Sequence, residues 1–413
     1  MLKQLLSFIL LFLAFSSCSW NSKDSSAPVI SKIVDTPLNN LFSKDEMEAY
    51  HRRIDASVDS IFSKSPLNGS LLVAKDGVII YEKYEGYINY RHKTDLINSN
   101  SSFHLASVSK TITATAILQL WQDKKLEIND PVSKYLAGFP IPDITVKSLL
   151  NHRSGLPNYV HYMEQLGWKR SNMVRNEDVL NFIIQNYKKI GINRVDRSFN
   201  YSNTNYALLA LIVERVTGSS FEGYLSQHFF QPLGMTNSYV FDLTDSLRSM
   251  PSFFRSGRQY AFDYLDLVYG DKNIYSTVQD IQKFEYALSS GSILNEETLN
   301  AAYAPYSKEK PGTHNYGLGW RMLELKNGKK IIYHNGWWHG NRTSFYRLPD
   351  EHVTIIALCN NDASNIYSIK RIANIFGPYF PSSEFSAPSS PIRHSKKTIR
   401  TRKKSKVSIK KRS

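Results

Sequence analysis

Apolar residues form strand-like runs in two separate regions of this chain, residues 70–82 and residues 316–359. Residues 70–75 and 78–82 are two such runs, separated by Asp76 and Gly77. An Asp-Gly pair between two β-prone runs is a strong signal for a two-residue hairpin turn. We therefore expect the first two strands of a sheet here.

Further β-prone runs lie far downstream. Residues 316–325 and 331–334 flank Asn327 and Gly328, a second hairpin signal, and residues 343–348 and 353–359 follow them. Their spacing and short connections are typical of antiparallel strands. These runs are expected to complete the sheet that the first hairpin begins.

The residues between the two groups of strands show helical periodicity. The expected helices are residues 108–121, 146–151, 177–187, 205–216 and 278–288. The fourth is followed by Gly218, a residue type that commonly ends a helix. Strands at both ends and helices between them predict an α+β domain. Its antiparallel sheet is built from both chain ends and flanked by helices, with a mostly helical inserted subdomain. We expect the whole domain to span residues 45–380.

Residues 1–17 predict an export signal, because Lys3 precedes a short apolar run, residues 5–15, and then small residues. The run is shorter than the roughly 20 residues that a membrane-spanning helix needs. Cys18 follows the small residues, as in a bacterial lipoprotein, where the cysteine is lipidated and anchors the protein to a membrane. The alternatives to lipidation are secretion without a lipid and a signal that stays uncleaved as an anchor. Residues 18–44 are polar and predict a linker. We expect an exported protein of the periplasm or cell envelope.

The net charge of +15 belongs mainly to the C-terminal residues. Residues 393–412 contain eleven Lys and Arg and no acid, which leaves +4 for the rest of the chain. Such a segment cannot bury a core, so residues 381–413 are predicted to form a disordered basic tail. Either the tail is simply solvated, or it binds an anionic envelope surface such as lipid headgroups. Nucleic acid is not expected as a partner of an exported protein.

Ser107 and Lys110 stand at the start of the helix expected at residues 108–121. A spacing of three places both on one helix face. A serine hydroxyl is a weak nucleophile unless a nearby base takes its proton, and a desolvated lysine can do so. The spacing alone is not specific, because Ser307 and Lys310 repeat it in a polar stretch with no apolar helical face.

Three motifs in order make a family resemblance specific: Ser107-x-x-Lys110, Tyr201-x-Asn203 and His334-x-Gly336. They resemble the active-site elements of the serine β-lactamase and penicillin-binding protein superfamily. The likeness is greatest to the class C branch, with its esterase and D-aminopeptidase relatives. It covers roughly residues 67–360 and includes the surrounding segments 103–110, 152–157 and 232–235.

The resemblance implies acyl transfer in two steps, without a metal or organic cofactor. Ser107 would attack a carbonyl carbon, Tyr201 together with Lys110 would move the proton, and water would then release the acyl group. A phenol close to an ammonium group ionises more easily, so Tyr201 is the candidate general base. His334 would stabilise this proton network.

The resemblance also implies the residues that bind substrate. Asn203 would hydrogen-bond the substrate or Lys110, although capping the helix that follows is the alternative. Gly336 would let substrate approach the backbone. The backbone N–H groups of Ser107 and Trp337 would form an oxyanion hole, in which each donor is typically worth about 10²–10³ in rate.

The residues after Gly336 depart from the small, glycine-rich pattern of many relatives. Trp337 and the tryptophan that follows it should narrow the cleft. Arg342 or His339 would hold a substrate carboxylate, unless they are ordinary surface residues. The substrate itself therefore cannot be transferred from relatives.

The substrate classes that fit are a D-alanyl or other D-amino-acid peptide, an ester, and a β-lactam. An envelope location favours a D-amino-acid peptide or ester. The alternative to an enzyme is a catalytically silent penicillin-binding sensor of the envelope. An α/β-hydrolase is disfavoured because no Gly-x-Ser-x-Gly motif occurs. Cys359 is the only cysteine besides Cys18, and we expect it to be a buried strand residue.

Overall fold

The computed structural model describes residues 41–381. The predicted export signal, Cys18 and all but the first residue of the predicted basic tail lie outside the described residues. Within residues 41–381, no helix combines the length and the apolar character needed to cross a lipid bilayer.

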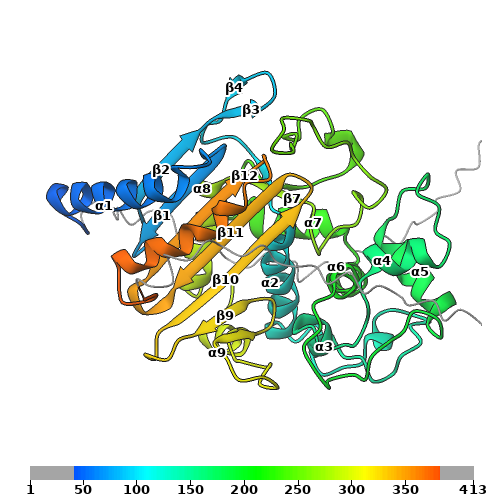
Figure 1. Ribbon diagram of the computed structural model, residues 1–413. Coiled ribbons are helices and arrows are strands. Elements are labelled where there is room, and N and C mark those ends of the chain that lie inside the picture. Colours follow the sequence, from blue (N-terminus) through cyan, green and yellow to red (C-terminus); the bar gives the residue numbers. More distant parts are fainter. Residues whose placement is uncertain (1–40, 382–413) are drawn as a thin grey trace, which may run out of the picture.

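A seven-stranded antiparallel sheet forms one half of the molecule, with the strand order β2-β1-β12-β11-β10-β9-β8 (Figure 1). Its strands are β1 (Gly69–Lys75), β2 (Val78–Glu85), β8 (His314–Tyr316), β9 (Arg321–Glu324), β10 (Lys330–Trp338), β11 (Asn341–Leu348) and β12 (Val353–Cys359). Antiparallel pairing of β1 with β12 joins the two ends of the domain. The predicted α+β architecture, with a sheet built from both chain ends, is confirmed.

The hairpin between β1 and β2 is the one that the sequence predicts. Asp76 and Gly77 have φ angles of 50° and 82°, and a type I′ turn requires positive φ at both positions. The run at residues 316–325 was expected to be one strand and is instead two, β8 and β9. A Cβ atom at Gly317 would collide with the backbone of the α9 end, and Gly319 has a φ of 91°, so the chain turns sharply between the two strands.

Five helices match the predicted ranges to within two residues: α2 (Ser109–Gln122), α3 (Val146–Leu150), α5 (Asn176–Asn186), α6 (Asn203–Thr217) and α8 (Val278–Ser289). The described chain also contains α1 (Lys44–Phe62), α4 (Tyr159–Gln165), α7 (Phe221–Leu225) and α9 (Glu296–Ala302). Short helical turns are η2 (Ala106–Val108), η3 (Val132–Lys134), η4 (Ser226–Phe230), η5 (Leu243–Asp245) and η6 (Pro349–Glu351), and η7 (Ser364–Ile375) is a longer 3₁₀-helical segment. Two small sheets pair β3 (Tyr87–Asn89) with β4 (Thr94–Leu96), and β5 (Phe103–His104) and β6 (Tyr239–Val240) with β7 (Ile274–Ser276).

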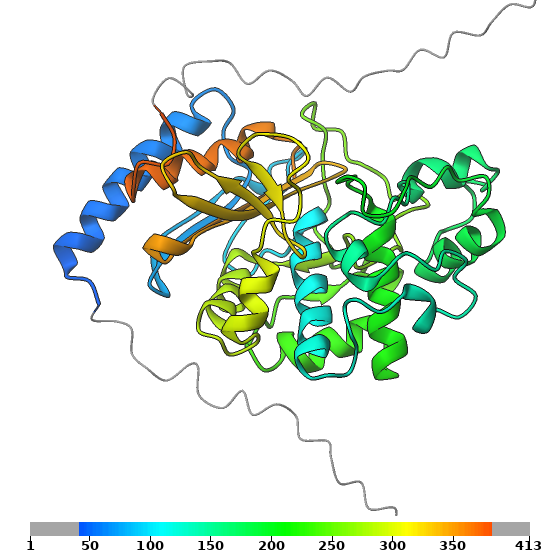
Figure 2. The same cartoon turned by 90° about the horizontal axis from the view of Figure 1, so that it is seen from below.

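Helices cover both faces of the large sheet. On one face α1 and η7 lie side by side (Figures 1 and 2), and Leu71 of β1 packs in their apolar cluster. On the other face Leu72 packs in the cluster that includes α2 and α8. This alternation is the period of two that a buried strand imposes. Cys359 is buried in the α1 and η7 cluster, as expected.

The helical subdomain, α3 to α7, lies beside the sheet with α2 between them (Figure 1). The η2 turn that leads into α2 contacts β10 and β11 of the sheet, and α2 contacts α6 of the subdomain, so the N-terminal end of α2 lies where the two halves meet. The predicted nucleophile turn is therefore at the junction of sheet and subdomain.

Three histidines are buried at this junction: His104, His152 and His334. Burial lowers the pKa of His104 to about 4. Burial and the nearby charges of Lys110 and Arg321 lower the pKa values of His152 and His334 well below 6.5. The unfolded chain therefore binds more protons than the folded chain once the pH falls below about 6.5, so acid should destabilise the fold.

We expect the free energy of unfolding to decrease as pH falls from 7 to 4.5. Each buried histidine should contribute up to about 1.4 kcal/mol per pH unit below its unfolded pKa. Urea denaturation at several pH values measures this slope. His152→Gln should make the slope shallower, whereas His92→Gln, at an exposed position, should not. Equal slopes in all three proteins would contradict the assignment.

Candidate active site

Ser107 lies in the η2 turn that leads into α2. The residue before it, Ala106, is buried and has a φ of 49°, a left-handed conformation that costs a non-glycine residue about 1 kcal/mol or more. The Ala106 N–H donates to His104 Nδ1 at 3.0 Å, and the Leu105 N–H donates to the carbonyl of Ile274 at 2.8 Å. These bonds hold the turn so that Ser107 stands at the positive end of the α2 dipole.

The structure brings Lys110 and Tyr201 to the same oxygen. Lys110 Nζ donates to Ser107 Oγ at 3.0 Å, and the Tyr201 hydroxyl donates to it at 2.9 Å. Lys110 is fully buried and also donates to the carbonyl of Asp271 at 2.6 Å. Its ammonium group is 5.1 Å from the centroid of the Tyr201 ring. After losing its proton, either group could accept the proton of Ser107.

His152 fixes the segment that carries Tyr201. Its carbonyl accepts the Asn200 N–H at 2.8 Å, and its Nδ1 accepts the Ser202 N–H at 3.2 Å. The ring centroids of His152 and Tyr201 are 4.3 Å apart. Nδ1 can accept because the lowered pKa keeps the ring neutral. The motif at residues 152–157 therefore positions Tyr201, a role that the sequence did not reveal.

His334 lies next to Tyr201, but among the described residues it forms no hydrogen bond with Ser107 or Tyr201. Its Nδ1 donates to the carbonyl of Asn335 at 2.9 Å, so its Nε2 accepts the Tyr316 hydroxyl at 3.2 Å. Its ring centroid is 6.3 Å from that of Tyr201. His334 is thus neutral, and it holds the Tyr316 hydroxyl beside Tyr201.

Arg321 of β9 was missed by the sequence analysis. Its guanidinium carbon lies 5.0 Å from the ring centroid of Tyr201 and 5.8 Å from that of Tyr316. The side chain is partly buried, and no carboxylate of the described residues forms an ion pair with it. The only sequence signal was a basic residue within a predicted strand. Arg321 therefore adds positive charge beside the candidate base.

Asn203 follows Tyr201 at the start of α6, and Gly336 of β10 lies against the nucleophile turn; their roles with substrate stay predictions. Asn203 is the first residue of α6, and Ser202 takes the cap position, so the helix-cap alternative is wrong. Its buried Oδ1 has no hydrogen-bond partner within the described chain, including Lys110. A Cβ atom at Gly336 would lie 2.5 Å from the Leu105 carbonyl and 3.0 Å from Ala106 Cβ. The glycine thus lets β10 approach the nucleophile turn.

Trp337 is 53% exposed, and the Arg342 guanidinium carbon is 4.2 Å from its ring centroid. Arg342 forms an ion pair with Asp362, and His339 Nε2 lies 3.0 Å from the Asp266 carboxylate. Both residues predicted to hold a substrate carboxylate already have a carboxylate partner in the protein. Their role with substrate stays a prediction, and Arg321 becomes the better candidate.

One group of side chains in the described chain has metal-ligand spacing: the ligand atoms of Asp263, Asp266 and His339 lie within 4.8 Å of one another. Asp266 already accepts hydrogen bonds from His339 and from Trp338 Nε1. These bonds bring His339 close to Asp266, and the Asp263 N–H donates to the same carboxylate at 2.6 Å.

Comparison with known proteins agrees with this geometry. The Beta-lactamase family model matches residues 62–376. The chain is 29% identical to Penicillin-binding protein 4* of Bacillus subtilis (strain 168) over 373 residues, 85% of this chain and 80% of that protein. It is 29% identical to Teichoic acid D-alanine hydrolase of Staphylococcus aureus (strain MRSA252) over 332 residues, 77% of this chain and 76% of that protein.

A solved structure shares the fold. D-amino acid amidase from Ochrobactrum anthropi SV3 superposes with a TM-score of 0.64 at 20% identity, covering 80% of this chain and 96% of the amidase. Together with the family match over residues 62–376, this agrees with the resemblance that the three motifs predicted. The chain belongs to the Beta-lactamase family and is a class C-like serine hydrolase.

Proposed function

We propose that the protein is an exported hydrolase that cleaves D-aminoacyl esters or amides of the cell envelope through an acyl intermediate on Ser107. The observation that carries the proposal is the convergence of Lys110 Nζ and the Tyr201 hydroxyl on Ser107 Oγ, at 3.0 and 2.9 Å. A nucleophile with two proton-exchanging groups in direct contact is suited to acyl transfer.

In the first step Ser107 Oγ bonds to the substrate carbonyl carbon while its proton passes to Tyr201 or Lys110. The negative charge on the carbonyl oxygen is stabilised by the N–H groups of Ser107 and Trp337. The bond to the leaving group then breaks, and the leaving group takes the proton. In the second step water attacks the acyl carbon, a proton passes back to Ser107, and the acid is released.

Two considerations support this substrate class. Relatives are named for hydrolysis of D-alanine from teichoic acid and for amidase activity on D-amino acids. The export signal predicted at residues 1–17 would bring the protein to such substrates. Another relative is a penicillin-binding protein, so β-lactams are a second class of acylating agent to test.

Ser107→Ala should abolish hydrolysis of D-alanine p-nitroanilide, p-nitrophenyl esters and nitrocefin, because no other group can form the acyl intermediate. Ser307→Ala, in the second Ser-x-x-Lys sequence between α9 and β8, is the matched control and should keep wild-type rates. Residual turnover by Ser107→Ala above background would contradict the assignment.

Tyr201→Phe should lower kcat by about 10²–10⁴, the usual contribution of a general acid–base group, with little change in KM. Tyr87→Phe, in the other Tyr-x-Asn sequence, serves as the control. Steady-state kinetics with one ester substrate measures both variants. A change of less than threefold in kcat would remove Tyr201 from the proton transfer.

Arg321 favours substrates that carry an acidic group near the scissile bond, because a partly buried guanidinium without a carboxylate partner can bind one. Arg321→Gln should raise KM about tenfold or more for an ester with a carboxylate on the leaving group, since a charged hydrogen bond contributes about 1.5–3 kcal/mol. The matched neutral ester should change less. Arg342→Gln should show a smaller difference because Asp362 neutralises Arg342. Equal effects on both esters in Arg321→Gln would exclude this role.

A further inference from the structure

A chain of buried hydrogen bonds begins at the nucleophile turn. His104 Nδ1 accepts the Ala106 N–H at 3.0 Å, so the proton of the neutral ring must be on Nε2. That proton is donated to Asn273 Oδ1 at 2.9 Å. Asn273 Nδ2 in turn donates to the backbone carbonyl of Asp266 at 2.6 Å. The residue before Ser107 is thereby connected to Asp266.

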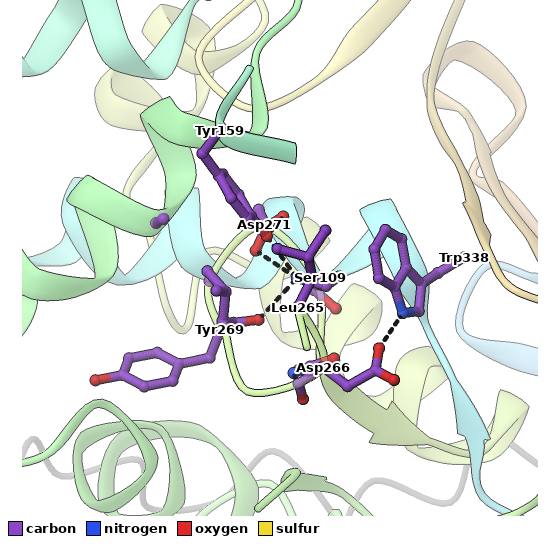
Figure 3. Close-up of polar contacts among 12 residues, drawn as sticks. Ser109, Tyr159, Leu265, Asp266, Tyr269, Asp271 and Trp338 are labelled. Carbon is purple, nitrogen blue, oxygen red and sulfur yellow. Dashed lines mark hydrogen bonds and ion pairs between the residues drawn. The ribbon is translucent and has the colours of Figure 1, made fainter. Parts of the chain in front are cut away.

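The side chain of Asp266 continues the chain to the other side of the site. Its carboxylate accepts the indole N–H of Trp338 at 2.6 Å (Figure 3) and the Nε2 proton of His339 at 3.0 Å. Burial alone raises the pKa of Asp266, but the hydrogen bond and charge of His339 bring it below its usual value. Asp266 is 3% exposed, and its carboxylate has hydrogen-bond partners in Trp338 and His339, as a buried ion requires.

Trp338 is held on its face as well as its edge. The buried Lys272 Nζ lies 4.7 Å from the centroid of the Trp338 ring. Lys272 is fixed by hydrogen bonds to the Tyr159 hydroxyl at 2.6 Å and to the Val268 carbonyl at 3.1 Å. The Trp338 side chain therefore cannot turn without breaking the bond to Asp266 or leaving Lys272.

The two N–H groups of the proposed oxyanion hole belong to Ser107 on η2 and Trp337 on β10, so their spacing depends on how these elements are joined. One connection is at Gly336, where β10 packs on the nucleophile turn, beside the bond from Thr343 Oγ1 to the Leu105 carbonyl at 2.7 Å. Both contacts lie at the paired residues Gly336 of β10 and Thr343 of β11, one residue before Trp337. The chain through Asp266 is a second connection, on the far side of Trp337.

We propose that Asp266 is a positioning residue of the hydrolytic reaction. Its backbone carbonyl holds the nucleophile turn through Asn273 and His104, and its carboxylate holds Trp338. Together these contacts set the alignment of the Ser107 and Trp337 N–H groups. This inference rests on the proposed function. Catalytic geometry must be held within about 0.5 Å, and a misplacement of 1 Å can lower a rate about 10²-fold.

Trp338→Phe tests the proposal, since it removes the indole donor and keeps an aromatic ring over Lys272. We expect kcat for a neutral p-nitrophenyl ester to fall about 10- to 100-fold and KM to stay within about twofold. Affinity for phenylboronic acid should fall about tenfold or more, because its adduct on Ser107 places a negative oxygen in the hole. Trp168→Phe is the matched control: it removes an indole bond of 2.9 Å to the Asn172 carbonyl in the helical subdomain and should change neither quantity.

Circular dichroism and the melting temperature separate positioning from stability. A folded Trp338→Phe protein with a lower melting temperature, but wild-type kcat and boronate affinity, would overturn the proposal. If Trp338→Phe does not fold, Asp266→Leu answers the same question with the same two readouts, because it removes both carboxylate acceptors and keeps the backbone carbonyl to which Asn273 donates. A wild-type protein that neither hydrolyses the ester nor binds the boronate would defeat the proposed function, and this inference with it.

Discussion

The buried ammonium group of Lys110 is the constraint on which the site depends. A charge removed from water costs several kcal/mol unless hydrogen bonds replace its hydration. Lys110 is fully buried, and its described partners are Ser107 Oγ and the carbonyl of Asp271. The carbonyl reaches Lys110 because Gly270, with a φ of 88°, lets the chain pass α6 so closely that a Cβ atom would lie 2.5 Å from the Tyr206 carbonyl. The close passage of Gly270 thus brings the Asp271 carbonyl to Lys110 Nζ.

The architecture explains why the reacting groups come from distant parts of the sequence. Ser107 belongs to η2, Lys110 to the first turn of α2, Tyr201 to the segment before α6, and His334 to β10. The sheet from both chain ends and the inserted helical subdomain meet along α2 (Figure 1). Each half therefore supplies one side of the site, and the contacts that join the halves also set the geometry of the reaction.

Local signals predicted much of this. Asp76 and Gly77 fixed the first hairpin, helical periodicity found five helices, and motif order found Ser107, Lys110 and Tyr201. A further local signal marks a helix that was not predicted: Ser43 and Glu46 form a capping box at the start of α1, and a serine followed three residues later by a glutamate is the sequence pattern of such a start.

What could not be predicted depends on contacts between residues far apart in the chain. Nothing local places Arg321 beside Tyr201, His152 beneath the segment of Tyr201, or Asp266 under Trp338. The strand period of two would have indicated that Trp337 and Trp338 point to opposite sides. In the structure Trp337 is 53% exposed, whereas the indole N–H of Trp338 is bonded to the buried Asp266. The two tryptophans therefore do different things, and treating them together as cleft-narrowing residues was too simple.

Mass spectrometry of the protein after separate incubation with a fluorophosphonate and with a penicillin tests the central claim most directly, because peptide mapping identifies the residue that each reagent modifies. The account predicts a fluorophosphonate adduct on the peptide that contains Ser107, and a penicillin adduct on the same residue if the cleft admits β-lactams. A fluorophosphonate adduct on another residue alone would contradict a nucleophilic Ser107, and no adduct at all on folded protein would favour the alternative of a binding protein.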